Sequence, residues 1–153
     1  MNEPIVITEK YKESEIIGCI ITNEHIYKDD NNIIPIKAMW DTGSSGTVIS
    51  SDLVKKLGLS PIGKSMVKSS GSSFKSGVYN LELLLAEKQI FRLQVTESDQ
   101  LNNSDMDVLI GMDVITLGDF AISTVGEEIC FSFRYPSQGF IDFKEQEIEK
   151  HGN

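Results

Sequence analysis

Apolar and polar residues alternate in short runs along most of this chain, with a period of two residues. Such a period places successive side chains on opposite faces of a β-strand. The pattern therefore predicts a mainly β protein. Strands are expected at residues 4–8, 15–22, 33–40, 47–50, 62–68, 73–86, 89–96, 107–111, 120–124 and 128–133.

Two short helices are predicted between these strands. Ser51 and Asp52 can cap a helix at 53–57, which Gly58 is suited to end, and residues 112–117 are expected to form one helical turn. Residues 141–151 are charged with thin apolar spacing, which is typical of a frayed helix or a disordered tail. Polar connections are predicted as a hairpin loop at 23–32, a small-residue turn at 69–72 and an acidic loop at 97–107.

Composition and charge are typical of one soluble globular domain and exclude several classes of partner. The chain has 153 residues, of which 40% are hydrophobic and 24% are charged. Its formal net charge of -9 argues against nucleic acid and against an anionic membrane surface, because no basic stripe is present to neutralise phosphates. No apolar run could span a bilayer, and the N-terminus lacks the pattern of a signal peptide, so we expect a cytoplasmic protein.

The candidate chemistry lies in Asp41-Thr42-Gly43, where one carboxylate follows an apolar strand and precedes a tight turn of small residues. A half-desolvated carboxylate with backbone N–H groups and hydroxyls close by is a typical setting for acid–base catalysis. Farther along the chain, Val108-Leu109-Ile110-Gly111 is expected to form a buried strand that ends at a glycine.

Together these two segments resemble the signature of the retropepsin-like aspartic peptidases, the single-lobe, retroviral-type enzymes and their relatives. In that family an Asp-Thr/Ser-Gly loop is followed, across a flap hairpin, by two hydrophobic residues and a glycine. The intervening order is also similar, with a β-branched strand at 47–49, a helix at 52–59 and a hairpin tip around Gly71. The resemblance covers residues 15–133.

The resemblance implies an all-β, closed, barrel-like acid-protease half-fold with a flap hairpin and one or two short helices. It places the protease domain at residues 1–135 and leaves a charged C-terminal tail at 136–153. It also implies an aspartic endopeptidase that hydrolyses extended peptides or proteins and needs no cofactor.

The family pattern further implies a role for each matching residue. Asp41 would be catalytic. The residues expected to support the active-site loop are Thr42, Gly43, Leu109, Ile110 and Gly111. The residues expected to bind substrate, from the loop and from the flap, are Ser44, Ser45, Ser70, Gly71 and Ser72.

The chain contains one Asp-Thr-Gly, and this bears on how an active site would be assembled. Hydrolysis of a peptide by carboxylates needs one group to take a proton from water and another to donate a proton to the carbonyl. Two carboxyls about 3 Å apart cannot both ionise, so they share a proton and supply both functions. One chain carries half of such a pair, which predicts a homodimer with Asp41 from each subunit on the two-fold axis.

Two departures from the family pattern support an alternative. Retroviral members usually carry an acid at the position of Ser45 and an arginine at that of Met112, and these form an ion pair. Both charges are absent here. The alternative is a catalytically weak or inactive module that binds or scaffolds peptides, and a third possibility is a capsid or other structural β protein.

Other chemistries have weaker support. Serine hydrolysis at Ser44 or Ser45 would need a base, whereas His25 is predicted in a polar loop and His151 in the tail. No metal site is expected, because two isolated histidines and two separated cysteines give no ligand spacing.

The remaining acids and thiols have plainer explanations. Asp99, Asp105 and Asp107 are expected to belong to a solvated acidic loop. Cys19 and Cys130 are expected to be buried free thiols, with a single disulfide as the alternative.

Overall fold

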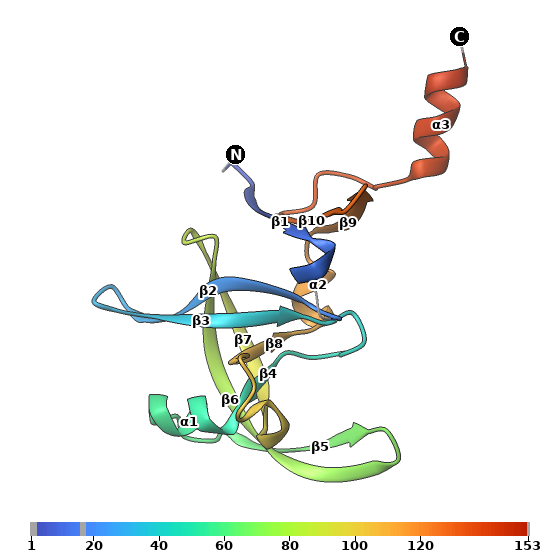
Figure 1. The fold of residues 1–153 in the computed structure, drawn as a ribbon. Helices are drawn as coiled ribbons and strands as arrows, with labels where there is room; N and C mark the ends of the chain where they lie inside the picture. The colour runs from blue at the N-terminus through green and yellow to red at the C-terminus, as the bar shows by residue number, and fades with distance from the viewer. Residues whose placement is uncertain (1–2, 16–17, 153) are drawn as a thin grey trace.

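The computed structural model describes residues 3–15 and 18–152, and more than half of the chain forms strands (Figure 1). The strands are β1 (Ile5–Lys12), β2 (Ile20–Asp29), β3 (Asn32–Trp40), β4 (Val48–Ser50), β5 (Gly63–Ser69), β6 (Ser72–Leu85), β7 (Gln89–Ser98), β8 (Val108–Ile110), β9 (Asp119–Val125) and β10 (Glu128–Tyr135). The α-helices are α1 (Ser51–Leu57), α2 (Met112–Ile115) and α3 (Phe143–His151).

The larger sheet closes on itself to form a barrel of six strands. Its strand order is β2-β3-β8-β4-β7-β6-β5, and an additional pairing of β2 with β6 joins the ends of the ring and leaves β5 outside it. The interior is filled by inward-facing aliphatic side chains that are fully buried, among them Ile49, Leu83, Val95 and Val108. The all-β, closed, barrel-like fold predicted from the sequence is confirmed.

A smaller sheet, in the order β1-β10-β9, lies against one end of the barrel (Figure 1). The indole ring of Trp40, at the end of β3, joins the two sheets. Its centroid lies 5.1 Å from that of Phe131 and 4.9 Å from that of Phe133, both on β10. Aromatic pairs at these distances stabilise beyond the area they bury. The residue before Asp41 is therefore fixed by the core.

The predicted loop at residues 23–32 is wrong, because β2 continues to Asp29 and only the turn at Asp30 and Asn31 separates it from β3. The face of β2 that points inward includes two polar residues, Thr22 and Glu24, which are 3% exposed. Because these two inward-facing residues are polar, the alternation of apolar and polar residues that indicates a strand is not visible in this part of the sequence. His25, expected in that loop, lies on β2 instead.

Other predicted boundaries shift by smaller amounts. The strand expected at 15–22 begins at Ile20, and its residues 16–17 lie outside the described part of the chain. Helix α1 is capped by the hydroxyl of Ser50, one residue earlier than expected, and ends at Gly58 in the left-handed conformation, as predicted. The acidic loop starts later than expected, because β7 extends to Ser98 and a 3-10 turn follows at Asp99–Leu101.

The C-terminal segment is tied to the smaller sheet at its start and then leaves it. The Asp119 carboxylate accepts hydrogen bonds from the Gln138 N–H and the Ser137 hydroxyl, which hold the pKa of Asp119 below its ordinary value, and it also pairs with Arg134. Phe140 is fully exposed, and α3 projects away from the body with none of its residues buried (Figure 1). Of the two predicted forms of this tail, the structure contains the helix.

Two further observations concern the thiols and the helices. Cys19 and Cys130 are free, as predicted, but both are half-buried rather than fully buried. No helix in residues 3–15 or 18–152 has the length and apolar character needed to cross a membrane.

A chain of buried hydrogen bonds connects Trp40 to an acid inside the protein. The indole N–H donates to the Thr22 hydroxyl at 2.9 Å, that hydroxyl donates to Glu24 Oε1 at 3.0 Å, and Glu24 Oε2 accepts the Ala86 N–H at 3.1 Å. Burial raises the pKa of Glu24, and the two hydrogen bonds offset part of that rise. Because the pKa of Glu24 is raised in the folded state, its protonated form stabilises the folded protein at low pH. This stabilisation is lost as the pH rises through the folded-state pKa.

We expect Thr22→Val to lower the free energy of unfolding by about 1–3 kcal/mol at pH 7, because it leaves the indole N–H unpaired and removes a donor to the Glu24 carboxylate. The variant raises the pKa of Glu24 further. The loss of unfolding free energy caused by Thr22→Val should therefore become smaller below about pH 4, where Glu24 is protonated in both the variant and the unchanged protein. Urea unfolding at several pH values measures this, with Thr8→Val on the exposed part of β1 as the control. An equal cost at every pH would contradict it.

Candidate active site

Asp41 lies at the edge where two parallel strands of the barrel end together. Strand β3 pairs in parallel with β8 so that Trp40 faces Ile110, and Asp41 and Gly111 follow these residues side by side. The Asp41 N–H donates to the Ile110 carbonyl at 2.9 Å. The carboxylate is half-buried, and its Oδ1 accepts the Gly43 N–H at 2.8 Å. Within residues 3–15 and 18–152, its Oδ2 has no hydrogen-bond partner.

The loop after Asp41 crosses directly over Gly111. A Cβ atom added at Gly111 would lie 2.4 Å from the Gly46 carbonyl oxygen and 2.9 Å from that of Ser44, so only glycine fits. The Met112 N–H donates to the Ser44 carbonyl at 2.8 Å across the same contact. We call this contact the Gly46–Gly111 crossing.

Thr47 and Asp113 fasten the far side of the crossing. The Asp113 carboxylate accepts the Thr47 N–H at 3.0 Å and the Thr47 hydroxyl at 2.8 Å. The Thr47 hydroxyl oxygen in turn accepts the Gly111 N–H at 3.2 Å. Thr47 is 1% exposed, so each of these polar groups needs the partner it has. The loop that carries Asp41 is thus held by hydrogen bonds from residues 110–113, a segment distant from it in sequence.

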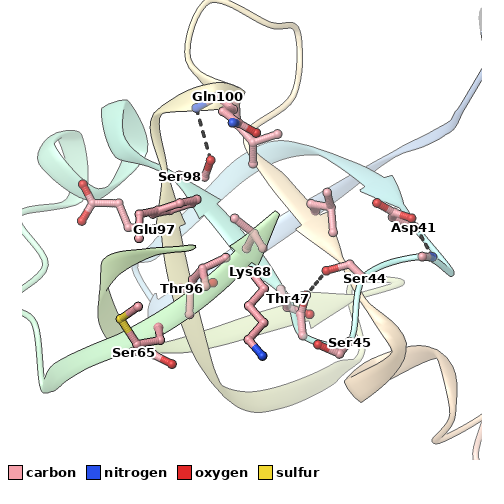
Figure 2. Close-up of a pocket in the computed structure, with 18 of the residues that line it drawn as sticks. Asp41, Ser44, Ser45, Thr47, Ser65, Lys68, Thr96, Glu97, Ser98 and Gln100 are labelled. Carbon is pink, nitrogen blue, oxygen red and sulfur yellow. Dashed lines mark hydrogen bonds between the residues drawn. The ribbon is translucent and has the colours of Figure 1, made fainter. Parts of the chain in front are cut away.

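A cleft of about 720 Å³ extends from Asp41 to the hairpin formed by β5 and β6 (Figure 2). One wall is the loop from Gly43 to Val48, and the opposite side is formed by the end of β7 and the 3-10 turn that follows. Polar and apolar groups contribute about equally to the lining, and its apolar side chains are Val48, Met66, Val67, Phe74, Leu101 and Leu109. Its hydroxyl and amide side chains are Ser44, Ser45, Thr47, Ser65, Ser70, Gln94, Thr96, Ser98 and Gln100.

The cleft contains a second acid besides Asp41, but the two lie apart. Glu97 accepts a hydrogen bond from the hydroxyl of buried Tyr79 at 2.5 Å, which raises the pKa of Tyr79. Figure 2 shows the Glu97 carboxylate pointing away from Asp41, at the other side of the cleft. Glu97 is therefore committed to Tyr79 and is not placed to act with Asp41.

The structure brings together some of the residues predicted for the site and places others outside the cleft. Those that line it are Asp41, Gly43, Ser44, Ser45, Ser70 and Leu109. Ile110 and Gly111 are buried beneath the loop. Thr42, Gly71 and Ser72 are exposed and do not line the cleft, and Gly71 forms the hairpin tip with a φ of +87°.

Sequence reasoning missed the Thr47–Asp113 pair and Lys68. Thr47 was expected only as a strand residue, and Asp113 only as part of a helical turn. A carboxylate two residues beyond Gly111 was the one available signal. It could not be interpreted without knowing that Thr47 lies opposite. Lys68, on β5, lines the cleft opposite the loop.

The departures at Ser45 and Met112 are also visible. Ser45 is exposed at the cleft, while the Met112 side chain is half-buried and packs against the hydrophobic core. No group of three or more His, Cys, Asp or Glu residues in the described ranges could hold a metal ion.

The chain matches one family and a set of solved structures. A family described as "Aspartyl protease" matches residues 29–114, which include Asp41, the hairpin and Gly111. No curated protein matches the chain. A retropepsin-like aspartic protease from Rickettsia conorii is similar in structure, with a TM-score of 0.54 and 18% sequence identity over 88% of this chain and 97% of that one. EIAV protease, solved with the inhibitor HBY-793, gives a TM-score of 0.46 and 13% identity over 66% of this chain and 88% of that one.

We expect Gly111→Ala to destabilise the protein by about 1–3 kcal/mol, because its Cβ would press on two backbone carbonyls that cannot rotate away. Gly46→Ala is the matched control, since a Cβ there meets nothing within 4 Å. Denaturant unfolding of both variants measures the difference. Equal midpoints for Gly111→Ala and the unchanged protein would show that the crossing is not tight.

Proposed function

This chain belongs to the aspartyl protease family, and we propose that it is an aspartic endopeptidase that works as a homodimer. The observation that carries the proposal is the setting of Asp41. Its carboxylate lies at one end of a cleft, has one oxygen without a partner among the described residues, and stands on a loop fixed by the Gly46–Gly111 crossing.

The need for a second subunit follows from the acids that line the cleft. Among the described lining residues these acids are Asp41 and Glu97, and Glu97 is bound to Tyr79. A carboxyl pair therefore requires Asp41 from a second copy, and a two-fold axis close to Asp41 would bring the two carboxyls together. Thr42 is exposed beside it, which leaves its hydroxyl available to brace the partner loop.

The chemistry of the pair follows from its shared proton. The ionised carboxyl takes a proton from a water molecule, whose oxygen attacks the peptide carbonyl carbon, while the protonated carboxyl donates to the carbonyl oxygen. The tetrahedral intermediate then collapses as a proton passes to the leaving nitrogen. An extended peptide would lie along the cleft beneath the β5–β6 hairpin, which would act as a flap.

We expect Asp41→Asn to lower kcat/KM for peptide cleavage by more than about a thousandfold, because the amide cannot serve as base or acid. The substitution is nearly isosteric, so the unfolding midpoint should stay within error of the unchanged protein. Cleavage of a broad peptide library at acidic and neutral pH is the assay. Undiminished cleavage by the variant would refute the assignment of Asp41.

The alternative is a module that binds peptides in the same cleft without cutting them. The loss of both charges at Ser45 and Met112 favours it, since the loop lacks an ion pair usual in the family. The library digest also separates the two functions. Cleavage that a statine inhibitor blocks excludes the alternative, whereas peptide binding without cleavage supports it.

We further expect the protein to sediment as a dimer, and more completely so with a statine inhibitor bound, because the inhibitor would span both halves of the site. Analytical ultracentrifugation over a range of concentrations tests this. A monomer that persists with bound inhibitor would exclude an active site shared between two subunits.

A further inference from the structure

The β5–β6 hairpin carries positive charge in an otherwise acidic protein. Its basic residues are Lys64, Lys68 and Lys75, and residues 60–80 contain no Asp or Glu, whereas the whole chain has a net charge of -9. The three lysines are exposed. They do not have the same surroundings, however, because only Lys68 lines the cleft.

Lys68 is the one basic residue among the described residues that line the cleft. Figure 2 shows its side chain extending from β5 among the labelled residues of the cleft, between Thr96 and Thr47 in that view. The ion pairs found in residues 3–15 and 18–152 involve Arg92, Arg134, Lys150 and His151, so the Lys68 ammonium group has no carboxylate partner there.

The acids of the cleft do not supply that partner. Neither Asp41 nor Glu97 lies within 4 Å of the Lys68 amine, since no such pair occurs among the described residues, and Glu97 already accepts the Tyr79 hydroxyl. Because Lys68 is exposed, its ammonium group is free to pair with an incoming carboxylate, with the modest gain in free energy that solvated ion pairs give.

We propose that Lys68 is a specificity-determining residue that selects peptides with an aspartate or glutamate side chain at one position near the cleaved bond. The proposal rests on the proposed peptidase function and adds a substrate class to it. An extended peptide directs alternate side chains to opposite faces, so only a position that faces the hairpin can reach Lys68. The hydroxyl and amide groups of the cleft can hydrogen-bond to polar side chains beside the acidic one, and its apolar residues can contact apolar side chains.

The experiment must separate Lys68 from the charge of the whole protein. A net charge of -9 repels any peptide of net negative charge at long range, whatever its sequence. We therefore specify a set of quenched fluorescent peptides of identical composition, in which one glutamate moves through the positions on both sides of the cleaved bond. Two parallel sets carry glutamine or lysine in its place.

We expect the unchanged protein to cleave the peptide with glutamate at one position about two- to fivefold faster, as kcat/KM, than its glutamine counterpart. Lys68→Gln should remove that preference, and Lys68→Glu should transfer it to lysine at the same position. Lys75→Gln is the matched control: it removes one charge from the same hairpin at a residue outside the cleft, and the preference should remain.

Three results would overturn the proposal. An unchanged glutamate preference in Lys68→Gln would show that Lys68 does not read the substrate. An equal loss of kcat/KM for glutamate and glutamine peptides in Lys68→Gln would show that Lys68 contacts the peptide backbone or supports the hairpin, and does not select the side chain. An equal effect of Lys75→Gln would assign the preference to the overall charge of the hairpin.

A binding measurement separates this proposal from the proposed peptidase function. Fluorescence anisotropy with the same peptide sequences, now carrying a single fluorophore and no quencher, on Asp41→Asn with and without Lys68→Gln reports the glutamate preference in the absence of turnover. If the unchanged protein cleaves none of the peptides, the peptidase proposal fails while the ratio of dissociation constants still tests Lys68. A ratio near one in the presence of Lys68 would refute the role of Lys68 alone.

Discussion

The close contact between the loop after Asp41 and Gly111 is the constraint on which the rest of the site depends. Two carbonyl groups, of Ser44 and Gly46, approach the Gly111 Cα more closely than any side chain would allow. That approach lets the Met112 N–H reach Ser44 and lets Thr47 bond both Gly111 and Asp113. The position of the Asp41 carboxylate is thus set by backbone contacts, which tolerate less variation than contacts between flexible side chains.

A second layer of polar and aromatic contacts supports this arrangement from within. Trp40 packs on Phe131 and Phe133, and its indole N–H is bonded through Thr22 to Glu24. Glu24 also holds the turn at Ala86, where the backbone adopts a φ of +53°. One buried carboxylate on β2 therefore connects the turn after β6 with the residue that precedes Asp41. Such networks specify a single arrangement, because each member left without its partner is costly.

The lining of the cleft distinguishes this protein from what its family resemblance alone suggests. Hydroxyl and amide groups share it about equally with apolar side chains, and one lysine of the hairpin, Lys68, also lines it. The charge pair usual around the loop in retroviral members is replaced by Ser45 at the cleft and by Met112 packed on the core. The loop is fastened by hydrogen bonds between Asp113 and Thr47. It is therefore held in place without that charge pair.

The sequence by itself determined the strands, the helix that ends at Gly58, the closed β fold and the family, because periodicity, turn residues and two short motifs are local signals. It misassigned residues 23–32, because Thr22 and Glu24 are polar residues that the fold buries and bonds. Only the tertiary structure showed that Thr47 meets Asp113, that Ser70 reaches the cleft while Gly71 and Ser72 do not, and that Lys68 faces the loop. These pairings join residues far apart in the chain, and no local pattern records which distant groups the closing of a barrel brings together.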